Sequence, residues 1–100
     1  MPDRYHIRIT PRALADLEGI FDYIRRDSPQ NAAKMIRTLL DAIDGLEILP
    51  NRYNVPRAGH ARGRQVRSMP VRPYLVRYRI EANTKTVRIL RIRHGARRRP

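Results

Sequence analysis

Arginine is the residue type that offers the most chemistry in this sequence, and it is concentrated in one half of the chain. Twenty of the 22 basic residues are arginine, and residues 57–100 hold 14 basic side chains against one acidic side chain, Glu81. Residues 1–56 hold eight of each sign. The planar guanidinium pairs bidentately with phosphate and carboxylate groups. We therefore expect the second half of the chain to present a basic surface that binds a polyanion or an acidic protein partner.

Two of these arginines lie in a segment with strand-like alternation, Tyr74–Glu81. Its even-numbered residues are apolar, whereas Arg77, Arg79 and Glu81 would share the opposite face. We expect the apolar face to pack on helices and the other face to meet solvent. Because like charges on one exposed face repel each other, we expect Arg77 and Arg79 to need an external counter-charge.

His94 is the strongest candidate for acid–base chemistry, since an unperturbed imidazole titrates near a pKa of roughly 6.5. It precedes Gly95 at the expected end of a strand. A structural or surface histidine is also common at such a position, and the sequence leaves both roles open.

Several other kinds of site are excluded or not expected. The chain has no cysteine, which rules out a disulfide, a thiolate metal site and a cysteine nucleophile. We expect neither a metal nor a cofactor. No stretch approaches the roughly 20 apolar residues that span a membrane, so we expect a cytoplasmic protein. A length of 100 residues fits one domain covering residues 1–100.

The first half of the chain supplies the elements that must position these side chains. Alternation over residues 5–10 predicts a strand. The dipeptides Thr10-Pro11 and Ser28-Pro29 are each typical of a helix start. Apolar residues at helical spacing then predict one helix from Pro11 to about Arg26 and a second that ends before Pro50, folded back as an antiparallel hairpin.

Three strands are predicted in the second half, after a loop over residues 50–62. We place them near Arg64–Met69, Tyr74–Glu81 and Thr86–Arg93. The order β-α-α-β-β-β predicts an α+β fold, in which an N-terminal strand, the helical hairpin and a three-stranded antiparallel meander form one sheet. We expect this sheet to be antiparallel, with the hairpin on one face.

Four parts of the sequence together resemble one protein family. They are the expected first strand, DLEGIFDYI in the helix pair, RPYLVRYRI, and VRILRIRHGARRRP. With these parts the chain resembles the RelE/ParE toxin superfamily over nearly its whole length. The most specific matches are Pro73-Tyr74, Val76-Arg77-Tyr78, Ile89-Leu90 and the segment His94–Arg97.

This resemblance implies the toxin of a type II toxin-antitoxin pair, neutralised by a cognate antitoxin. ParE-like members inhibit DNA gyrase by binding, whereas RelE-like members cleave messenger RNA at the ribosome. For a ribonuclease, Arg67, Arg77 and Arg79 would stabilise the phosphate and His94 would act as acid or base. The tail after His94, GARRRP, lacks the tyrosine that ribonuclease members commonly carry there, so the ending is more similar to the ParE-like members.

We therefore expect a ParE-like toxin with gyrase as its target, and ribosome-bound message as the alternative target. The residues expected to bind the antitoxin or the target are Arg64, Arg67, Arg77, Arg79, His94, Arg97 and Arg98. Apolar grooves beside the helical hairpin are expected to anchor the antitoxin. A third hypothesis is a small basic nucleic-acid-binding protein without a toxin role. The sequence speaks against it, because aromatic residues are not interleaved with the basic ones.

Overall fold

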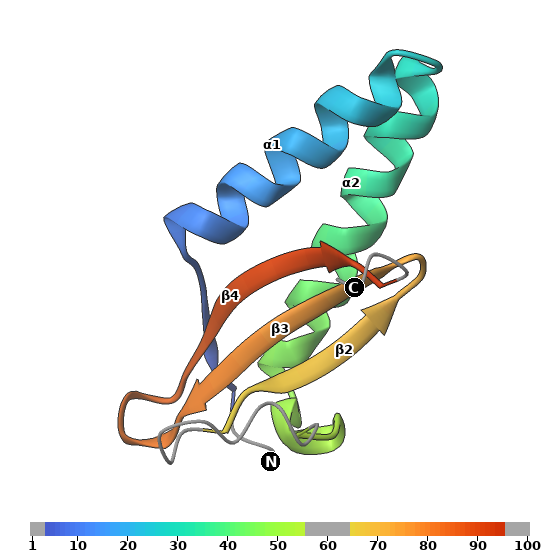
Figure 1. Cartoon of the computed structure of the whole chain (residues 1–100). Helices are drawn as coiled ribbons and strands as arrows, with labels where there is room; N and C mark the ends of the chain where they lie inside the picture. Colours follow the sequence, from blue (N-terminus) through green and yellow to red (C-terminus); the bar gives the residue numbers. More distant parts are fainter. Residues whose placement is uncertain (1–3, 56–64, 96–100) are drawn as a thin grey trace.

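The fold is a four-stranded sheet with a helical hairpin on one face (Figure 1). The computed structural model describes residues 4–55 and 65–95. Its helices and strands are β1 (His6–Ile9), α1 (Pro11–Arg25), α2 (Pro29–Asp44), β2 (Arg67–Val71), β3 (Tyr74–Glu81) and β4 (Thr86–His94). The predicted α+β order is confirmed. Within the described ranges, no helix is long and apolar enough to cross a membrane.

Both helices begin where the sequence predicts, because a capping side chain precedes each. The Thr10 hydroxyl accepts a hydrogen bond from the Ala13 N–H at 3.2 Å, and the Ser28 hydroxyl accepts one from the Asn31 N–H at 3.1 Å. A proline follows each cap, at a position where a backbone N–H would have no partner within the helix. The two starts therefore fix where the hairpin turns.

The sheet is mixed, so the expectation of an antiparallel sheet is wrong for one strand. β2, β3 and β4 form the predicted antiparallel meander, but β1 pairs parallel with β4, giving the order β1-β4-β3-β2. After α2 the chain returns to the start of β1, where the Tyr5 N–H donates to the Glu47 carbonyl at 2.9 Å. β2 consequently runs in the same direction as β1. Two hairpin reversals then make β4 parallel to both.

β2 starts three residues later than predicted and includes Pro70, which was predicted to lie in the following turn. β2 is at the edge of the sheet. An edge strand tolerates proline because a backbone group that faces away from the sheet needs no partner strand. Arg72 and Pro73, joined by a cis peptide bond, then make the turn into β3.

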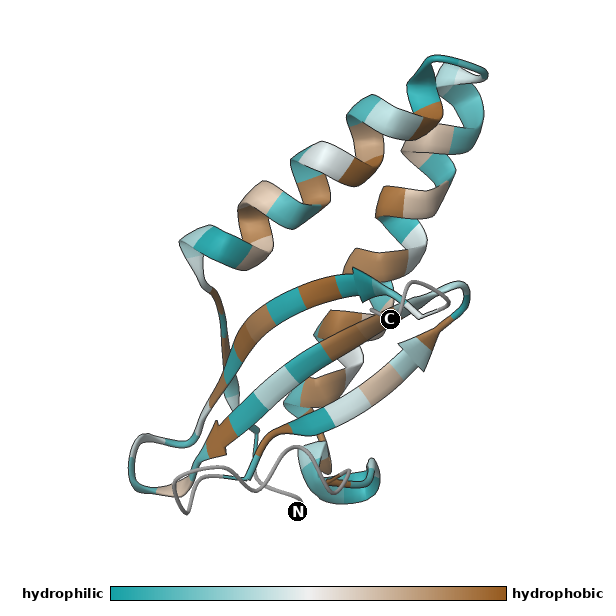
Figure 2. Ribbon diagram, viewed as in Figure 1, coloured by the Kyte–Doolittle hydropathy of each residue, from teal (hydrophilic) through white to brown (hydrophobic). Residues whose placement is uncertain are grey.

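The apolar face of β3 packs against the helices as predicted, with Tyr74, Val76 and Tyr78 buried. In Figure 2, hydrophobic and hydrophilic residues are interspersed along β3 and β4. The core joins residues from both α-helices, from the turn after α2 and from the three strands of the meander: Ala13, Leu17, Leu39, Ile43, Leu46, Met69, Tyr74, Val76, Tyr78, Val87, Ile89 and Ile92.

A β-bulge in β4 keeps one face of this strand apolar. Leu90 has no partner on β3, because Tyr78 pairs with Ile89 and Arg77 pairs with Arg91. The extra residue resets the alternation of side chains. Ile89 and Ile92 therefore both lie in the core, although three positions separate them.

Candidate binding surfaces

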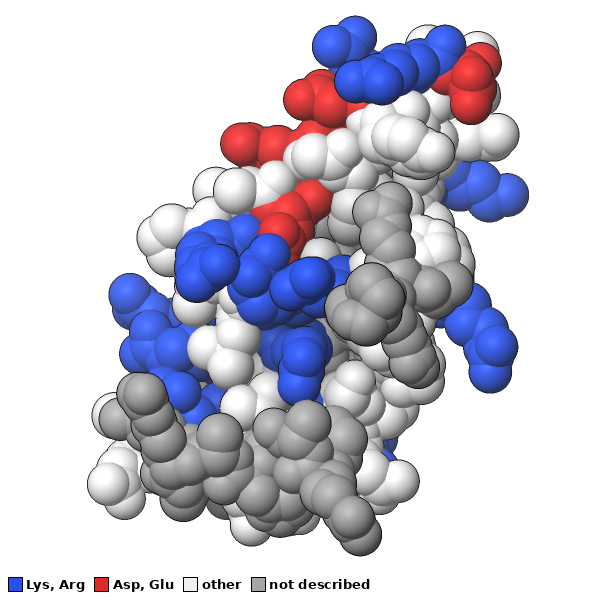
Figure 3. Space-filling view, viewed as in Figure 1, with Lys and Arg blue, Asp and Glu red and all other residues white. Residues whose placement is uncertain are grey.

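The face of the sheet opposite the helices, called the open face below, carries arginines in cross-strand pairs. Arg79 lies opposite Arg88, which in turn lies opposite Arg8 of β1, and Arg77 lies opposite Arg91. Residues that are directly opposite project from the same face of a sheet. Figure 3 shows basic side chains gathered over β3 and β4 on this face. Arg93, opposite Leu75, lies on it too.

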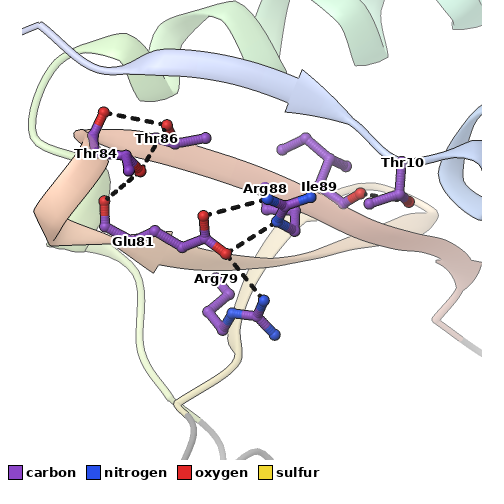
Figure 4. Close-up of polar contacts among 7 residues, drawn as sticks. All are labelled: Thr10, Arg79, Glu81, Thr84, Thr86, Arg88 and Ile89. Carbon is purple, nitrogen blue, oxygen red and sulfur yellow. Dashed lines mark hydrogen bonds and ion pairs between the residues drawn. The ribbon is translucent and has the colours of Figure 1, made fainter.

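Glu81 holds two of these arginines (Figure 4). One of its carboxylate oxygens accepts hydrogen bonds from Arg79 Nη2 and from Arg88 Nε, each at 3.0 Å, and the other accepts one from Arg88 Nη2 at 3.3 Å. These bonds, first from Arg88 and then from Arg79, lower the pKa of Glu81 from 4.5 to about 2. Arg79 therefore has an internal counter-charge, which corrects the expectation that it depends on an external one.

Asp16 of α1 holds a third arginine and ties the helix to the sheet. Its carboxylate accepts from Arg91 Nε at 2.9 Å, from Arg91 Nη2 at 3.2 Å and from the Ile92 N–H at 2.8 Å. Burial raises the pKa of Asp16, but the bonds from Arg91 and from the Ile92 N–H outweigh that effect, so the net pKa is lowered. β1 ends at Ile9, opposite Ile89, which leaves the Ile92 N–H at an uncovered part of the β4 edge.

Arg77 differs from its neighbours on the open face. It is partly buried, and no hydrogen bond or ion pair joins it to an acidic side chain in the described part of the chain. Arg79, two residues along β3, is paired with Glu81, and Arg91, directly opposite, is paired with Asp16. Arg77 is thus an uncompensated cation between two compensated ones.

The structure does not bring the four residues of the ribonuclease hypothesis together. Arg77 and Arg79 lie on the open face, but Arg67 lies opposite Tyr78 and so shares the helix-side face of the sheet. Its guanidinium donates to the Tyr53 carbonyl at 2.7 Å and to the Asn51 carbonyl at 3.3 Å. These bonds fix the segment after α2 against β2.

His94 also lies on the helix-side face. It pairs with Tyr74, and the two rings meet edge to face with their centroids 5.5 Å apart at 78°. Because Tyr74 and Arg77 lie on opposite faces of β3, His94 projects away from the open-face arginines. Of the remaining predicted site residues, Arg64, Arg97 and Arg98 lie outside the described residues.

Four residues of the open face were not predicted from the sequence: Arg8, Arg88, Arg91 and Arg93. A fifth, Asp16, comes from the helix. A signal for Arg88 was available, because Val87 and Ile89 alternate with it. Arg91 could not be assigned to the same face, since the bulge at Leu90 reverses the alternation and only strand pairing reveals it.

The groups near the open face favour binding over proton transfer. The pKa of Glu81 is lowered to about 2, and that of Asp16 is lowered as well. Tyr78, whose pKa burial raises to about 12, lies on the helix side of the sheet. The Tyr78 hydroxyl donates to the Pro50 carbonyl inside the core. A general acid or base works best with a pKa near the working pH. Among the described residues, no group of three or more potential ligand side chains is arranged to hold a metal ion.

A second surface, called the apolar groove below, lies between the helices and the end of β1. It encloses about 510 Å³ and is lined by Ile9, Leu14, Leu17, Glu18, Phe21, Asp22, Ile36 and Leu40. Leu14 is 50% exposed, and Phe21 and Leu40 are each 36% exposed. Ile9 lies opposite the buried Ile89, which places the groove on the helix side of the sheet, away from the open face.

The sequence of this chain matches a family of known proteins over most of its length. The model of the family described as "ParE toxin of type II toxin-antitoxin system, parDE" matches residues 7–99. A protein of Caulobacter vibrioides named "Toxin RelE2" is 42% identical over 88 residues, which cover 88% of this chain and 92% of that protein. "Putative toxin Y4kP" of Sinorhizobium fredii is 33% identical over 92 residues, covering 92% and 90% of the two chains.

Solved structures show the same fold. A chain of the chromosomal ParDE toxin-antitoxin system from P. aeruginosa superposes with a TM-score of 0.70 at 24% identity, covering 91% of this chain and 96% of that one. A chain of the toxin-antitoxin complex RelBE2 from Mycobacterium tuberculosis superposes with a TM-score of 0.60 at 26% identity, covering 92% of each chain.

Proposed function

Because this chain belongs to the ParE toxin family of type II toxin-antitoxin systems, we propose that it acts by binding and inhibiting DNA gyrase until a cognate antitoxin neutralises it. Residues 1–100 act as one toxin domain in the cytoplasm, where gyrase works. The observation that supports binding rather than catalysis is that His94 lies on the helix side of the sheet, whereas Arg77 and Arg79 lie on the open face.

Cleavage of a phosphodiester by its own 2′-hydroxyl needs a proton acceptor and donor beside the cations that stabilise the phosphate. The two carboxylates that reach the open-face arginines, Glu81 and Asp16, both have a lowered pKa because they accept hydrogen bonds from arginine, and that of Glu81 is about 2. The sequence after His94 contains no tyrosine. This combination supports a surface that binds its target without cutting it.

The apolar groove is the proposed binding site of the antitoxin. Exposed apolar patches of this kind mark interaction sites, and the rim of the groove carries two carboxylates, Glu18 and Asp22. An amphipathic antitoxin segment fits it if apolar side chains meet Leu14, Phe21 and Leu40 and a basic side chain meets the rim. The similarity to chains from two toxin-antitoxin complexes supports such a partner.

The proposal is tested with the purified chain in two assays. We expect it to block supercoiling of relaxed plasmid by gyrase, to leave ribosome-bound message intact, and to lose the first effect when the antitoxin is added. The variant His94→Ala should leave gyrase inhibition unchanged, since His94 lies against Tyr74 on the helix side. Site-specific message cleavage that disappears in His94→Ala would sink the gyrase proposal.

Ribosome-dependent cleavage of messenger RNA is the second candidate function. It is favoured by the 42% identity to the protein named "Toxin RelE2", which is higher than the identity to the ParDE chain. On this reading Arg77 and Arg79 would stabilise the phosphate. Message cleavage in the second assay, abolished by Arg77→Gln, would establish this function in place of gyrase inhibition.

A further inference from the structure

The open face carries more positive charge than its own carboxylates neutralise. Six arginines share it, and in the described ranges only Glu81 and Asp16 reach them. The six are Arg8, Arg77, Arg79, Arg88, Arg91 and Arg93. Like charges directly opposite each other destabilise a sheet. A ligand that brings negative charge to this face therefore relieves a repulsion that is already present.

Arg77 is the centre of this imbalance. A strand rises about 3.3 Å per residue, so Arg77 and Arg79 lie roughly 7 Å apart along β3. Arg77 also faces Arg91 across the strand pair. Both neighbours have acidic partners of their own, and Arg77 has none in the described part of the chain. Partly buried arginines at the centre of a surface are among the residues that dominate binding energy.

The chemistry of the face favours carboxylates over a nucleic acid. Glu81 and Asp16 each engage an arginine through both its Nε and its Nη2, so the face already binds carboxylates in the two-pronged mode. Single-stranded nucleic acid binds by stacking bases on aromatic rings. The register puts no phenylalanine, tyrosine or tryptophan on the described part of the open face, because Tyr74 and Tyr78 face the core.

We propose that the open face binds an extended acidic segment of a protein partner, with Arg77 as the central anchor and Glu81 as a built-in competitor for Arg79 and Arg88. Carboxylates two residues apart on an extended segment repeat at the same interval as Arg77 and Arg79. The first carboxylate pairs with Arg77, and the next displaces Glu81. This inference rests on the proposed function and deepens it, because it names the chemistry of the antitoxin segment that the open face binds.

The test measures binding of a fluorescent synthetic peptide of alternating glutamate and serine to the full chain by anisotropy. Arg77→Gln should weaken binding roughly tenfold, because it removes a charge-assisted pair. Glu81→Gln should tighten binding by roughly threefold to tenfold and steepen its dependence on salt, because two arginines become available. In NMR spectra of the unmodified chain, the Arg88 Nε–H resonance should shift when peptide is added. In Glu81→Gln the same resonance should already differ from that of the unmodified chain before any peptide is added.

The control variants remove one positive or one negative charge from α2, which covers the other face of the sheet. Arg37→Gln and Asp41→Asn should each leave peptide affinity within about twofold, since exposed charges farther away than the Debye length are screened. Thermal unfolding of each variant verifies that it is folded. An oligothymidylate of equal charge is titrated in parallel.

Three results overturn the inference. They are tighter binding of the oligothymidylate than of the peptide, a Glu81→Gln affinity no higher than that of Asp41→Asn, and an Arg77→Gln affinity equal to that of Arg37→Gln. If the peptide experiment fails, gyrase inhibition is still tested independently, because the gyrase assay does not depend on which residues bind the peptide. A chain that binds the peptide as expected but inhibits no gyrase instead refutes only the proposed function.

Discussion

Arg77 and Arg79 are two residues apart on β3 and share one face, yet their surroundings differ. Arg79 donates to Glu81, whereas Arg77 stands between two internally paired arginines. Arg67 differs from both, because its guanidinium donates hydrogen bonds to the carbonyls of Asn51 and Tyr53. These three arginines therefore differ in role: Arg67 fixes a loop, Arg79 pairs with an internal carboxylate, and Arg77 is the one that we propose offers its charge to a partner.

The acid stability of the fold should depend on Glu81. Folding lowers the pKa of this carboxyl from 4.5 to about 2, so its bonds to Arg88 and Arg79 stabilise the fold fully above pH 4.5. The contribution is lost as the pH falls from 4.5 towards 2. We expect the urea midpoint of the unmodified chain to fall across this window, and Glu81→Gln to remove part of that fall.

The control for this experiment is Asp41→Asn, which removes a negative charge from α2 at a side chain without an ion-pair partner in the described residues. It should retain the pH dependence of the unmodified chain. If Glu81→Gln and the unmodified chain lose stability in parallel as the pH falls, then the contacts of Glu81 do not stabilise the fold.

At the scale of the elements, the two helix caps look alike in sequence but act differently in the fold. Ser28 caps α2, and its hydroxyl accepts a hydrogen bond from the Asn31 N–H of its own helix. Thr10 caps α1, and its hydroxyl also donates to the Ile89 carbonyl of β4 at 2.8 Å while its N–H donates to the same carbonyl at 3.1 Å. Thr10 therefore joins β1, α1 and β4.

Replacing the two caps should separate these roles. Ser28→Ala should cost about 1 kcal/mol of unfolding free energy, the usual effect of losing a helix cap. Thr10→Ala should cost roughly 2 kcal/mol, because the Ile89 carbonyl loses a hydrogen-bond donor as well. Thr10→Ser, which keeps both bonds, should stay close to the unmodified chain. Urea unfolding checks the order, and equal costs for the two alanine variants would show that the bond to Ile89 contributes nothing.

At the scale of the whole molecule, two unlike surfaces lie on opposite sides of the sheet. The open face is basic, and the apolar groove beside the hairpin is apolar with the acidic rim of Glu18 and Asp22. A chain of 100 residues buries a modest share of its surface, and a bound partner adds stability by mass action. A partner that covers both surfaces would neutralise the charge and shield the exposed apolar side chains at once.

The groove gives a prediction for the antitoxin complex. Leu14→Asp should weaken antitoxin binding by roughly 2 kcal/mol, about thirtyfold, because it puts a charge at an apolar anchor. The stability of the free chain should change by no more than about 0.5 kcal/mol, since Leu14 is half exposed. Titration calorimetry and urea unfolding measure the two effects.

Tyr23→Asp is the matched control for the groove. Tyr23 is 66% exposed on the same helix and does not line the groove. Its variant should bind the antitoxin with the affinity of the unmodified chain. Equal losses for both variants would mean that the antitoxin covers α1 as a whole and that the groove is not its seat.

Local patterns in the sequence were enough for the order of the elements, both helix starts and the buried face of β3. Each of these depends on residues close together in the chain: a cap beside a proline, apolar spacing along one helix, and alternation along one strand. The basic character of the second half also follows from counting alone. Even the open-face position of Arg77 and Arg79 could be read from the alternation in β3.

Tertiary structure alone decided how the charges are used, because pairing across strands depends on register and on distant segments. The parallel pairing of β1, the bulge at Leu90 and the return of the chain after α2 are set by contacts between residues far apart in sequence. Those contacts put Asp16 against Arg91, 75 positions away, and turn Arg67 and His94 to the helix side of the sheet. No local pattern carries that information, since alternation specifies two faces of a strand without specifying what lies against them.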